Sequence, residues 1–396
     1  MAVEKIHIEQ FLELSEHHQV IDVRSPAEYN HAHMPGAYNL PLFSDEERKI
    51  VGTTYKQQSR EHAIKVGLEF FGPKMRGMVD KVEELISNRQ LAIGKSSQFS
   101  IAPAGRSEPL PIADCPRGSA GLLIYCWRGG MRSAGVAWLL DLYGFKVYTL
   151  IGGYKKFRNY VLHTFRQPFE LNIIGGFTGS GKTEILKELK KAGQAVIDLE
   201  HIARHKGSAF GNIGLAPQPT QEMFENLLAL ELKKAISPAF DIQSGFETST
   251  HSSLITDHSS LWLEDESQRI GQVNIPTDLW NRMRISPVYF LDIPFEERLN
   301  YLIQEYGKLD IQRMIEAIER IRQRLGGLET KNAIQFLMEN NISGCFNILL
   351  KYYDKCYVKG LHNREGIETL LSRISCEQVN SLNAKRLLRN PTYENH

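Results

Sequence analysis

The sequence lacks the features that define several specialised classes of protein. It has no run of 18 or more apolar residues, and its N-terminus, MAVEKIHIEQ, lacks the apolar core of a signal peptide. Its five cysteines are odd in number and form no CxxC pair, which argues against a disulfide framework and a zinc ribbon. Its net charge of +1 excludes a uniformly basic nucleic-acid binder, but leaves a local basic face open. We therefore expect a cytoplasmic protein without a membrane partner, whose cysteines are free to react.

The length and composition predict an ordinary globular protein with more than one domain. A chain of 396 residues exceeds what one hydrophobic core usually organises. Hydrophobic residues make up 42% and charged residues 23%, as in typical soluble domains. Short β-branched runs alternate with helical patterns along most of the chain, so we predict an α/β fold with parallel sheets.

The first domain is expected over residues 1–153. Strands are predicted at 20–23, 37–40, 121–125 and 146–150. Helices are predicted from Ser25 and at 133–143. An insertion of different character occupies residues 42–120, with helical spacing in its first part. Residues 91–120 hold 3 Gly, 4 Pro and 5 Ser and lack periodicity, which favours a flexible loop there.

A linker helix is expected over residues 154–167, followed by a second α/β domain over 168–295. This domain begins with a strand at Phe169, a glycine-rich turn and a helix. Further strands are predicted at 194–198, 260–265 and 287–293. From residue 296 to 396 the amphipathic spacing indicates a wholly helical region.

One cysteine stands at the junction of a predicted strand and helix, in the segment IYCWRGGMRSAG at residues 124–135. Backbone N–H groups after Cys126, together with the helix N-terminus, favour a thiolate or another anion. A buried structural cysteine is the alternative, but two glycines and two arginines within the next six residues favour a reactive group. The candidate anion site consists of Arg128, Gly129, Gly130, Arg132 and Ser133 around the catalytic Cys126.

A second loop, GFTGSGKT at residues 176–183, fits the phosphate-loop pattern GxxxxGK[ST] between a strand and a helix. We expect its backbone amides to wrap linked phosphates, Lys182 to neutralise them and Thr183 to be able to hold Mg²⁺. The candidate diphosphate-binding residues are Gly176, Gly179, Ser180, Gly181, Lys182 and Thr183. The motif leaves open whether the ligand is a nucleotide.

Four carboxylates follow strands of the second domain and could organise a metal ion or act as acid or base. They are Asp198, Glu264, Asp265 and Glu266. Each is equally well interpreted as a helix cap or a surface acid.

The loop CWRGGMRS, together with IDVRSPAEY, MPGAYNLPL and LIGGYKKFR, resembles a rhodanese domain. That resemblance implies an active cysteine that carries sulfur or selenium. Five residues separate Cys126 from Arg132, which is one more than in the common rhodanese loop and equals the spacing of cysteine phosphatases. Those phosphatases usually have histidine before the cysteine, where this chain has Tyr125. The phosphatase alternative stays open on the residues alone.

The whole chain resembles the bacterial tRNA 2-selenouridine synthase family. Further matching stretches are YKQQSREHAIKVG, DLEHIARHKGSAFG, QPTQEMFEN and EDESQRIG. The resemblance implies a transferase with no tightly bound cofactor that acts on a tRNA carrying a wobble 2-thiouridine. Geranyl diphosphate first alkylates the sulfur, and selenophosphate then supplies the selenium of 2-selenouridine.

On this resemblance, Lys182, Thr183 and the loop amides would hold geranyl diphosphate instead of ATP. Cys126 would be the selenium carrier or the attacking group, and Arg128 and Arg132 would receive selenophosphate.

A tRNA substrate requires basic and stacking side chains. The candidates are Arg204, His205, Arg320, Arg322, Arg324, Lys351, Tyr352 and Lys355. The charge from residue 296 onward, 15 Lys+Arg against 13 Asp+Glu, is weak support. Packing tyrosines and a solvated helix end are the alternatives.

Two other functions compete with this interpretation. LDIPFEERL resembles stretches of P-loop kinases, so an ATP-dependent kinase fused to a sulfurtransferase is one alternative, and it predicts ATP turnover. A non-catalytic module with a degenerate P-loop is the other, and the complete GSGKT turn argues against it.

Overall fold

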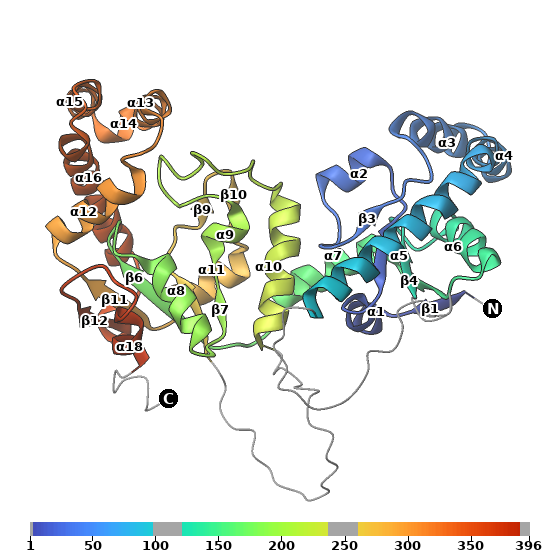
Figure 1. Ribbon diagram of the computed structural model, residues 1–396, viewed down its shortest axis with the longest axis horizontal. Coiled ribbons are helices and arrows are strands. Elements are labelled where there is room, and N and C mark those ends of the chain that lie inside the picture. Colours follow the sequence, from blue (N-terminus) through green and yellow to red (C-terminus); the bar gives the residue numbers. More distant parts are fainter. Residues whose placement is uncertain (1–2, 98–120, 237–259, 389–396) are drawn as a thin grey trace, which may run out of the picture. The chain divides into compact units, whose positions relative to one another are not determined.

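The computed structural model describes residues 3–97, 121–236 and 260–388 (Figure 1). The chain forms two compact units, Met1–Val161 and Leu162–His396. The boundary falls within helix α7 (Gly153–Thr164), in the segment where the sequence indicates a linker helix. Across the described ranges, every helix is too short or too polar to cross a membrane.

The first unit is built on a five-stranded parallel sheet with the order β1-β5-β4-β2-β3. The strands are β1 (Glu4–Ile6), β2 (Gln19–Asp22), β3 (Tyr38–Asn39), β4 (Leu122–Tyr125) and β5 (Val147–Leu150). Every residue of the central strand β4 is buried, as expected for a parallel strand that helices cover on both faces. The predicted parallel sheet is confirmed.

Helices surround this sheet and follow local start signals. They are α1 (Ile8–Ser15), α2 (Pro26–His31), α3 (Asp45–Gln57), α4 (Arg60–Phe71), the 3-10 turn η1 (Gly72–Lys74), α5 (Met75–Ser97) and α6 (Met131–Tyr143). Ser25 caps α2 and Pro26 begins it, as the sequence indicates.

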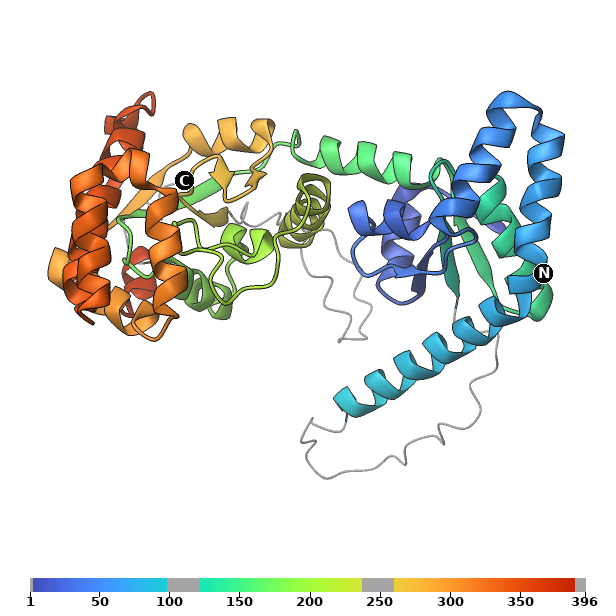
Figure 2. The same ribbon diagram turned by 90° about the horizontal axis from the view of Figure 1, so that it is seen from above.

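Helix α5 corrects the predicted loop at 91–120. The helix continues to Ser97 and is drawn as one long rod in Figure 2. The loop was predicted from the composition of the whole segment 91–120. All four prolines of this segment come after Ser97, so the composition of the later residues decided the prediction for residues 91–97 as well. Residues 98–120 lie outside the described part of the chain.

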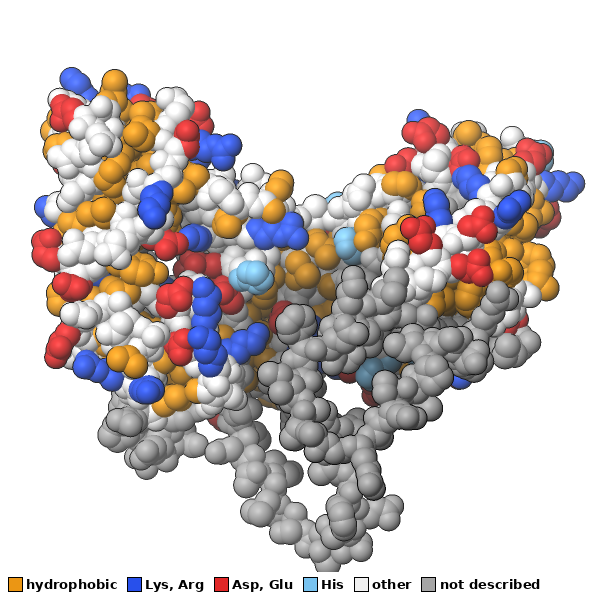
Figure 3. All heavy atoms as spheres, in the orientation of Figure 1, with side chains coloured by type: hydrophobic (Ala, Val, Ile, Leu, Met, Phe, Trp, Pro, Cys, Tyr) orange, Lys and Arg blue, Asp and Glu red, His pale blue; other side chains and the backbone are white. Residues whose placement is uncertain are grey.

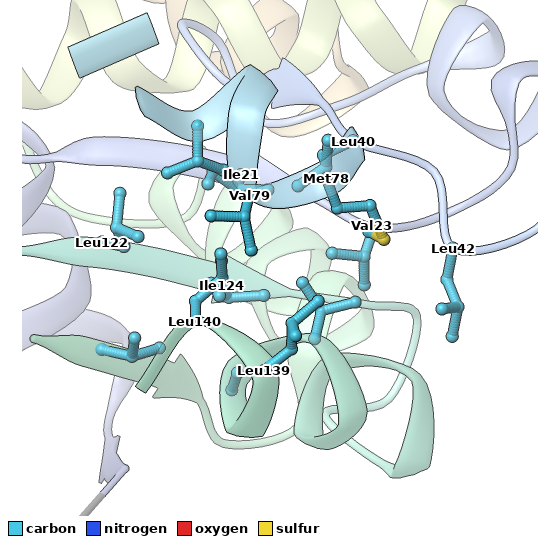
Figure 4. Packing of buried hydrophobic residues seen from close by; sticks show 14 of the residues in the cluster. Ile21, Val23, Leu40, Leu42, Met78, Val79, Leu122, Ile124, Leu139 and Leu140 are labelled. Atoms are coloured by element: carbon cyan, nitrogen blue, oxygen red, sulfur yellow. The ribbon is translucent and has the colours of Figure 1, made fainter. Parts of the chain in front are cut away.

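The core of the first unit lies between the sheet and helices α5 and α6 (Figure 4). Ile21 and Ile124 extend from β2 and β4, and Val79 and Leu140 from the two helices. Each is fully or almost fully buried, which contributes roughly 1.5–3 kcal/mol per large aliphatic side chain. This packing fixes the end of β4, where the cysteine loop begins.

The second unit contains another five-stranded parallel sheet, with the order β12-β11-β6-β8-β7. Its strands are β6 (Leu171–Gly176), β7 (Val196–Ile197), β8 (Leu261–Glu264), β11 (Val288–Asp292) and β12 (Leu371–Ser375). A separate antiparallel pair consists of β9 (Arg269–Ile270) and β10 (Val273–Asn274).

Strand β12 corrects the prediction of a wholly helical region over 296–396. The chain returns after its long C-terminal helices and pairs Leu371–Ser375 with β11. Of the five residues LSRIS, Ile374 alone is fully buried, so the edge strand carries almost no apolar alternation. A strand with so little periodicity cannot be distinguished from a loop by its sequence.

Helices of the second unit cover both the sheet and a separate helical core. They are α8 (Lys182–Lys191), α9 (Leu199–Ala203), α10 (Gln221–Ile236), α11 (Thr277–Arg284), α12 (Phe295–Tyr306), α13 (Ile311–Arg320), α14 (Arg322–Leu325), α15 (Gly327–Met338), α16 (Ile342–His362), α17 (Ile367–Leu370) and α18 (Asn383–Leu388). The 21-residue α16 packs against α12 and α15. The loops after β6, β7 and β8 meet at the carboxyl edge of the sheet, where α/β proteins usually bind ligands.

Candidate active sites

The cysteine loop is held by close backbone contacts. Cys126 directly follows β4, and the amide of Tyr154 donates to its carbonyl at 2.8 Å. The amide of Lys155 donates to the Trp127 carbonyl at 3.0 Å. Gly129 has a φ of +66°, and a Cβ there would lie 2.5 Å from the Leu150 carbonyl oxygen. Glycine is therefore required at 129, because the loop turns tightly against the chain after β5.

The sulfur of Cys126 accepts hydrogen bonds although the residue is only 3% exposed. The Gly130 amide donates to it at 3.3 Å, and the Ser133 hydroxyl lies 3.2 Å away. Burial raises the pKa of the thiol, but the bonds from Ser133 and the loop amides and the charge of Arg132 together bring it below its ordinary value. The loop thus favours thiolate at the end of an apolar core.

The two arginines of this loop have different surroundings. Arg132 donates from Nη1 to Oε2 of Glu28 at 2.8 Å, whereas Arg128 is exposed. Arg48 also donates to Glu28 Oε2 at 2.8 Å. Burial raises the pKa of Glu28, but the two arginines outweigh it and hold the pKa at about 2. Glu28 was not among the predicted site residues, although it lies in the quoted stretch IDVRSPAEY.

Tyr125, at the position of the phosphatase histidine, is a core residue. It is fully buried, its hydroxyl accepts the Met34 amide at 3.1 Å, and its ring stacks on Tyr154 at 6.1 Å. Its neighbour Arg24 forms a buried ion pair with Asp22 at 2.6 Å and lies over the Tyr154 ring at 3.8 Å. These contacts fix the strand ends beneath the cysteine loop.

The phosphate loop connects β6 to α8, as the motif requires. Gly176 has a φ of +147°, and a Cβ there would lie 2.5 Å from the Ser180 hydroxyl. The Lys182 ammonium donates to the Gly176 carbonyl at 3.2 Å, so it lies across its own loop. Thr183 donates to Glu200 Oε2 at 3.3 Å. The predicted residues Gly176, Gly179, Ser180, Gly181, Lys182 and Thr183 all line one cavity.

Distant segments of the chain hold the phosphate loop in place. Arg298 on α12 donates to the Thr178 carbonyl at 3.1 Å and binds Asp354 of α16 through both of its terminal nitrogens, at 2.9 and 2.8 Å. The Tyr357 hydroxyl accepts the Gly176 amide at 3.2 Å and donates to Asp265 at 2.7 Å. No sequence motif indicated these three positioning residues, because their partners lie 56 to 181 positions away.

The four predicted carboxylates have different surroundings. Asp198 accepts the His201 amide at 2.7 Å and caps α9, which is the helix-cap alternative. Asp265 is held by Tyr357 and by Arg364, whose Nη2 donates to it at 2.7 Å.

Glu264 and Glu266 are protonatable groups near the phosphate loop. Burial and the neighbouring acids Asp198 and Glu200 raise the pKa of Glu264 well above its ordinary value. Burial and Glu200 raise the pKa of Glu266 to about 8, against the opposing charge of Lys182. Within the described residues, no group of three or more acidic, histidine or cysteine side chains is placed to hold a metal ion.

Glu200 is an acidic residue beside the phosphate loop that the sequence analysis did not predict. It contacts Thr183, and its amide donates to Glu264 at 2.8 Å. Burial raises its pKa against the opposing charge of Lys182. Its position just after β7, beside the phosphate loop at the carboxyl edge of the sheet, is the signal that could have identified it.

A cavity of about 1080 Å³ extends from the phosphate loop along helix α16. Its polar side carries Lys182, Thr183, Glu200 and Glu266. Its apolar side is formed by Phe210, Leu302, Tyr306, Phe346, Leu349, Leu350 and Tyr353. Leu302 directly contacts the phosphate loop, since a Cβ on Gly179 would lie 3.0 Å from its Cγ. The lining therefore combines phosphate-binding amides with hydrocarbon that belongs largely to the buried helical core.

Of the predicted tRNA-binding residues near the cavity, one is accessible. Arg204 is exposed, lines the cavity and donates to the Pro217 carbonyl at 3.3 Å. His205 is half-buried, and Cβ atoms on Gly211 and Gly271 would each lie 2.7 Å from its ring. The imidazole is therefore packed between two backbone segments.

The C-terminal candidates have different surroundings, and their role in tRNA binding stays a prediction. Arg320 donates to the Ala209 carbonyl at 3.2 Å, Arg322 pairs with Glu319 at 3.3 Å, and Arg324 is exposed. Lys351 and Lys355 are exposed, but Tyr352 packs edge-on against Tyr353 at 5.2 Å, which is the packing alternative. On the face drawn in Figure 3, acidic and basic side chains are interspersed over the described part of the second unit.

Together the two units define a class of protein in which a thiolate loop on a rhodanese-like sheet is joined to a P-loop domain. The family model of the tRNA 2-selenouridine synthase AAA domain matches residues 169–387, more than half of the chain. The rhodanese-like domain model matches residues 7–65, which precede the cysteine loop.

Curated relatives span nearly the whole chain. A tRNA 2-selenouridine synthase of Bdellovibrio bacteriovorus is 32% identical and covers 87% of this chain and 89% of its own. Those of Hydrogenovibrio crunogenus and Shewanella oneidensis are 35% and 33% identical, covering 78% and 85% of this chain and 76% and 85% of their own. The chain belongs to the tRNA 2-selenouridine synthase family of tRNA-modifying enzymes.

Proposed function

We propose that the enzyme converts wobble 2-thiouridine into 2-selenouridine by two successive transfers, through an S-geranyl intermediate. Geranyl diphosphate supplies the alkyl group and selenophosphate the selenium. The observation that carries this proposal is the single cavity in which the phosphate loop adjoins an apolar wall. An allylic diphosphate has the same two parts.

The polar side suits a diphosphate. Loop amides, Lys182 and the N-terminus of α8 would surround its charge. Glu266, with a pKa of about 8, is mostly neutral at neutral pH and does not repel the anion. Mg²⁺ stays a prediction: Thr183 would hold it together with phosphate oxygens and water, since Mg²⁺ usually keeps several waters and needs no complete protein cage.

The apolar side favours a prenyl chain over a nucleoside. Phe210, Tyr306 and Phe346 form an aromatic cluster, with ring centroids 5.7 to 6.2 Å apart. Ribose hydroxyls would lose their hydrogen bonds to water against such a wall, which is unfavourable, whereas a geranyl chain would gain by burial. This contrast argues against the alternative of an ATP-dependent kinase.

The first transfer breaks the C1–O bond of geranyl diphosphate and forms a bond between C1 and the thiocarbonyl sulfur. Lys182 and the loop amides stabilise the charge that develops on the departing diphosphate. A thiocarbonyl sulfur leaves poorly, and its alkylation makes it a thiol that can depart.

In the second transfer, selenium forms the new bond to C2 and the geranylthiol departs with the electron pair. Water cleaves the P–Se bond of selenophosphate, and phosphate is released. Cys126, as thiolate, is the attacking group: its sulfur bonds to C2 as the geranylthiol departs, and the selenium then displaces that sulfur from C2 and regenerates the thiolate. Arg132 and the exposed Arg128 receive the selenophosphate anion.

Two variants separate the steps. Lys182→Ala is expected to abolish geranylation while selenation of pre-geranylated tRNA largely continues. Cys126→Ser is expected to accumulate geranylated tRNA without 2-selenouridine. Mass spectrometry of tRNA nucleosides measures both products. Loss of both steps alike in Lys182→Ala, or normal selenation in Cys126→Ser, would contradict the proposal.

A further inference from the structure

The cavity has a second end, beyond the phosphate loop, at helix α11. Trp280 and Arg284 of α11 line it together with Gly360 and Leu361 of α16. Arg284 donates from Nη2 to the Gly360 carbonyl at 3.3 Å. Tyr357, three residues earlier on α16, contacts the Gly176 amide. Along α16, the residue that contacts α11 is therefore about one helical turn, roughly 5 Å, beyond the residue that contacts the phosphate loop.

This end lies away from the apolar wall. The α16 residues of the apolar wall, Phe346, Leu349, Leu350 and Tyr353, precede Tyr357, whereas Gly360 and Leu361 follow it. Because the helix rises 1.5 Å per residue, Leu350 and Gly360 are about 15 Å apart along its axis. A prenyl chain on the apolar wall would leave the α11 end free for a second substrate.

The α11 end carries an excess of positive charge. Burial lowers the pKa of the Arg284 guanidinium, and the positive charge of the neighbouring Arg364 lowers it further. The carboxylate between them, Asp265, is already bound by Arg364 at 2.7 Å and by Tyr357 at 2.7 Å. Arg364 is almost fully buried, and its Nε and Nη1 have no hydrogen-bond partner in the described part of the chain. One carboxylate therefore faces two guanidinium groups, and an anion would balance them.

An aromatic ring lies beside this charge. Trp280 is half-buried, and the Arg284 guanidinium lies 5.6 Å from the centre of its indole ring. An indole ring beside an arginine that shares its carboxylate with a second arginine suits a single nucleotide, because the ring can stack on the base and the cation can pair with its phosphate.

We propose that the α11 end of the cavity is the subsite for the substrate nucleotide of the tRNA, with the base stacked on Trp280 and a flanking phosphate paired with Arg284. This proposal rests on the proposed function, since it assigns the second substrate of the geranyl transfer. The base enters as a nucleotide turned out of the anticodon loop, in which unstacked bases are available for recognition. Its subsite then adjoins Gly360, which is one helical turn along α16 from Tyr357 at the phosphate loop.

The test measures geranylation by the full-length enzyme on 2-thiouridine tRNA at saturating geranyl diphosphate. Trp280→Ala is expected to raise the KM for tRNA about 10-fold or more, within the range that loss of one stacked base gives. Trp280→Phe, which keeps an aromatic face, should have a KM for tRNA close to that of the wild-type enzyme. Arg284→Ala should raise the same KM several-fold and weaken its dependence on salt, and Arg284→Lys should partly restore both.

Matched controls remove the same side chains elsewhere. Trp138→Ala, on the exposed face of α6, and Arg313→Ala, on the exposed face of α13, should leave the KM for tRNA unchanged. Calorimetry with geranyl diphosphate should give wild-type affinity for Trp280→Ala.

Three results would overturn the proposal. The first is an unchanged KM for tRNA in Trp280→Ala. The second is a loss of geranyl diphosphate binding in the same variant. The third is ATP binding by the wild-type enzyme that this substitution removes. Each would leave the wild-type geranylation intact, and absence of that activity in the wild-type enzyme would instead refute the proposed function.

Discussion

At the scale of single residues, the state of the Cys126 thiol depends on a neighbouring hydroxyl. Ser133 Oγ lies 3.2 Å from the sulfur and 3.0 Å from the Gly130 carbonyl oxygen. Its single hydroxyl proton can be donated to either acceptor, and donation to the sulfur stabilises the thiolate. The position of Ser133 in the first turn of α6 places it there.

Replacement of Ser133 by alanine is expected to raise the pKa of Cys126. The lowered pKa of the wild-type thiol means a larger thiolate fraction at neutral pH, and removal of a hydrogen bond to the charged form reduces that fraction. The thiolate absorbance of the wild-type protein minus that of Cys126→Ser, followed against pH, gives the midpoint. Selenation at neutral pH should slow, whereas geranylation should not change. A midpoint that stays at its wild-type value would show that the amides alone stabilise the thiolate.

The sequence predicted individual reactive groups better than their partners. Cys126 and Lys182 were identified because glycine and cation spacing around each has a local chemical meaning. Glu28 and Tyr357 contact these two loops from residues far along the chain, so no local spacing could indicate them. Glu200 had a positional signal, the end of a strand, but strand ends are uncertain by several residues in a sequence.

At the scale of elements, the pair Arg298–Asp354 joins α12 and α16 to the phosphate loop. Arg298 is 3% exposed and Asp354 is 19% exposed, so the pair is largely removed from water. The same guanidinium donates to the Thr178 carbonyl. Two helices between strands β11 and β12 thereby determine where the phosphate-binding turn lies.

Removal of Asp354 should destabilise the second unit far more than removal of an acidic residue from an exposed ion pair. Asp354→Ala leaves a buried guanidinium without its counterion, which costs about 3 kcal/mol or more. Glu319→Ala breaks the exposed pair with Arg322 and should cost about 0–1 kcal/mol. Pulse proteolysis in urea, scored on fragments from residues 162–396, measures both free energies of unfolding. Equal effects of the two substitutions would show that the Arg298 pair is exposed to solvent in solution.

Elements with strong periodicity were predictable, and those without it were not. Most parallel strands of the two sheets follow from buried runs such as LLIY and VYFLD, but β1, in which Ile6 alone is buried, was not predicted. Strand β12 and the last turns of α5 were missed, because the first is a nearly polar edge strand and the second precedes a proline-rich segment. Tertiary pairing with β11 determines β12, and a local pattern cannot report it.

At the scale of the whole molecule, each compact unit carries one of the two loops. Cys126 belongs to the unit Met1–Val161 and Lys182 to the unit Leu162–His396. Each sheet and each core is complete within its own unit. Under the proposed function, the two transfers therefore use separately folded sites.

Two full-length variants, each deficient in one of the two transfers, should complement each other. A mixture of Cys126→Ser, which geranylates, and Lys182→Ala, which selenates, is expected to produce 2-selenouridine when tRNA can dissociate between them. Each variant alone should give none from 2-thiouridine tRNA. Nucleoside mass spectrometry with a time course checks this, and Cys126→Ser mixed with a Cys126→Ser/Lys182→Ala double variant is the control. A mixture that never yields selenouridine would mean that the intermediate passes between the units of one molecule without release.

Helix α16 also limits how this pocket can change in evolution. A single residue inserted between Tyr353 and Tyr357 would rotate everything after it by about 100° and withdraw Tyr357 from Gly176 and Gly360 from Arg284 together. Homologues with altered donor preference should therefore differ by replacements along this helix while its length stays constant. Selection experiments that diversify its residues without changing their number offer the most direct route to enzymes that attach other alkyl groups.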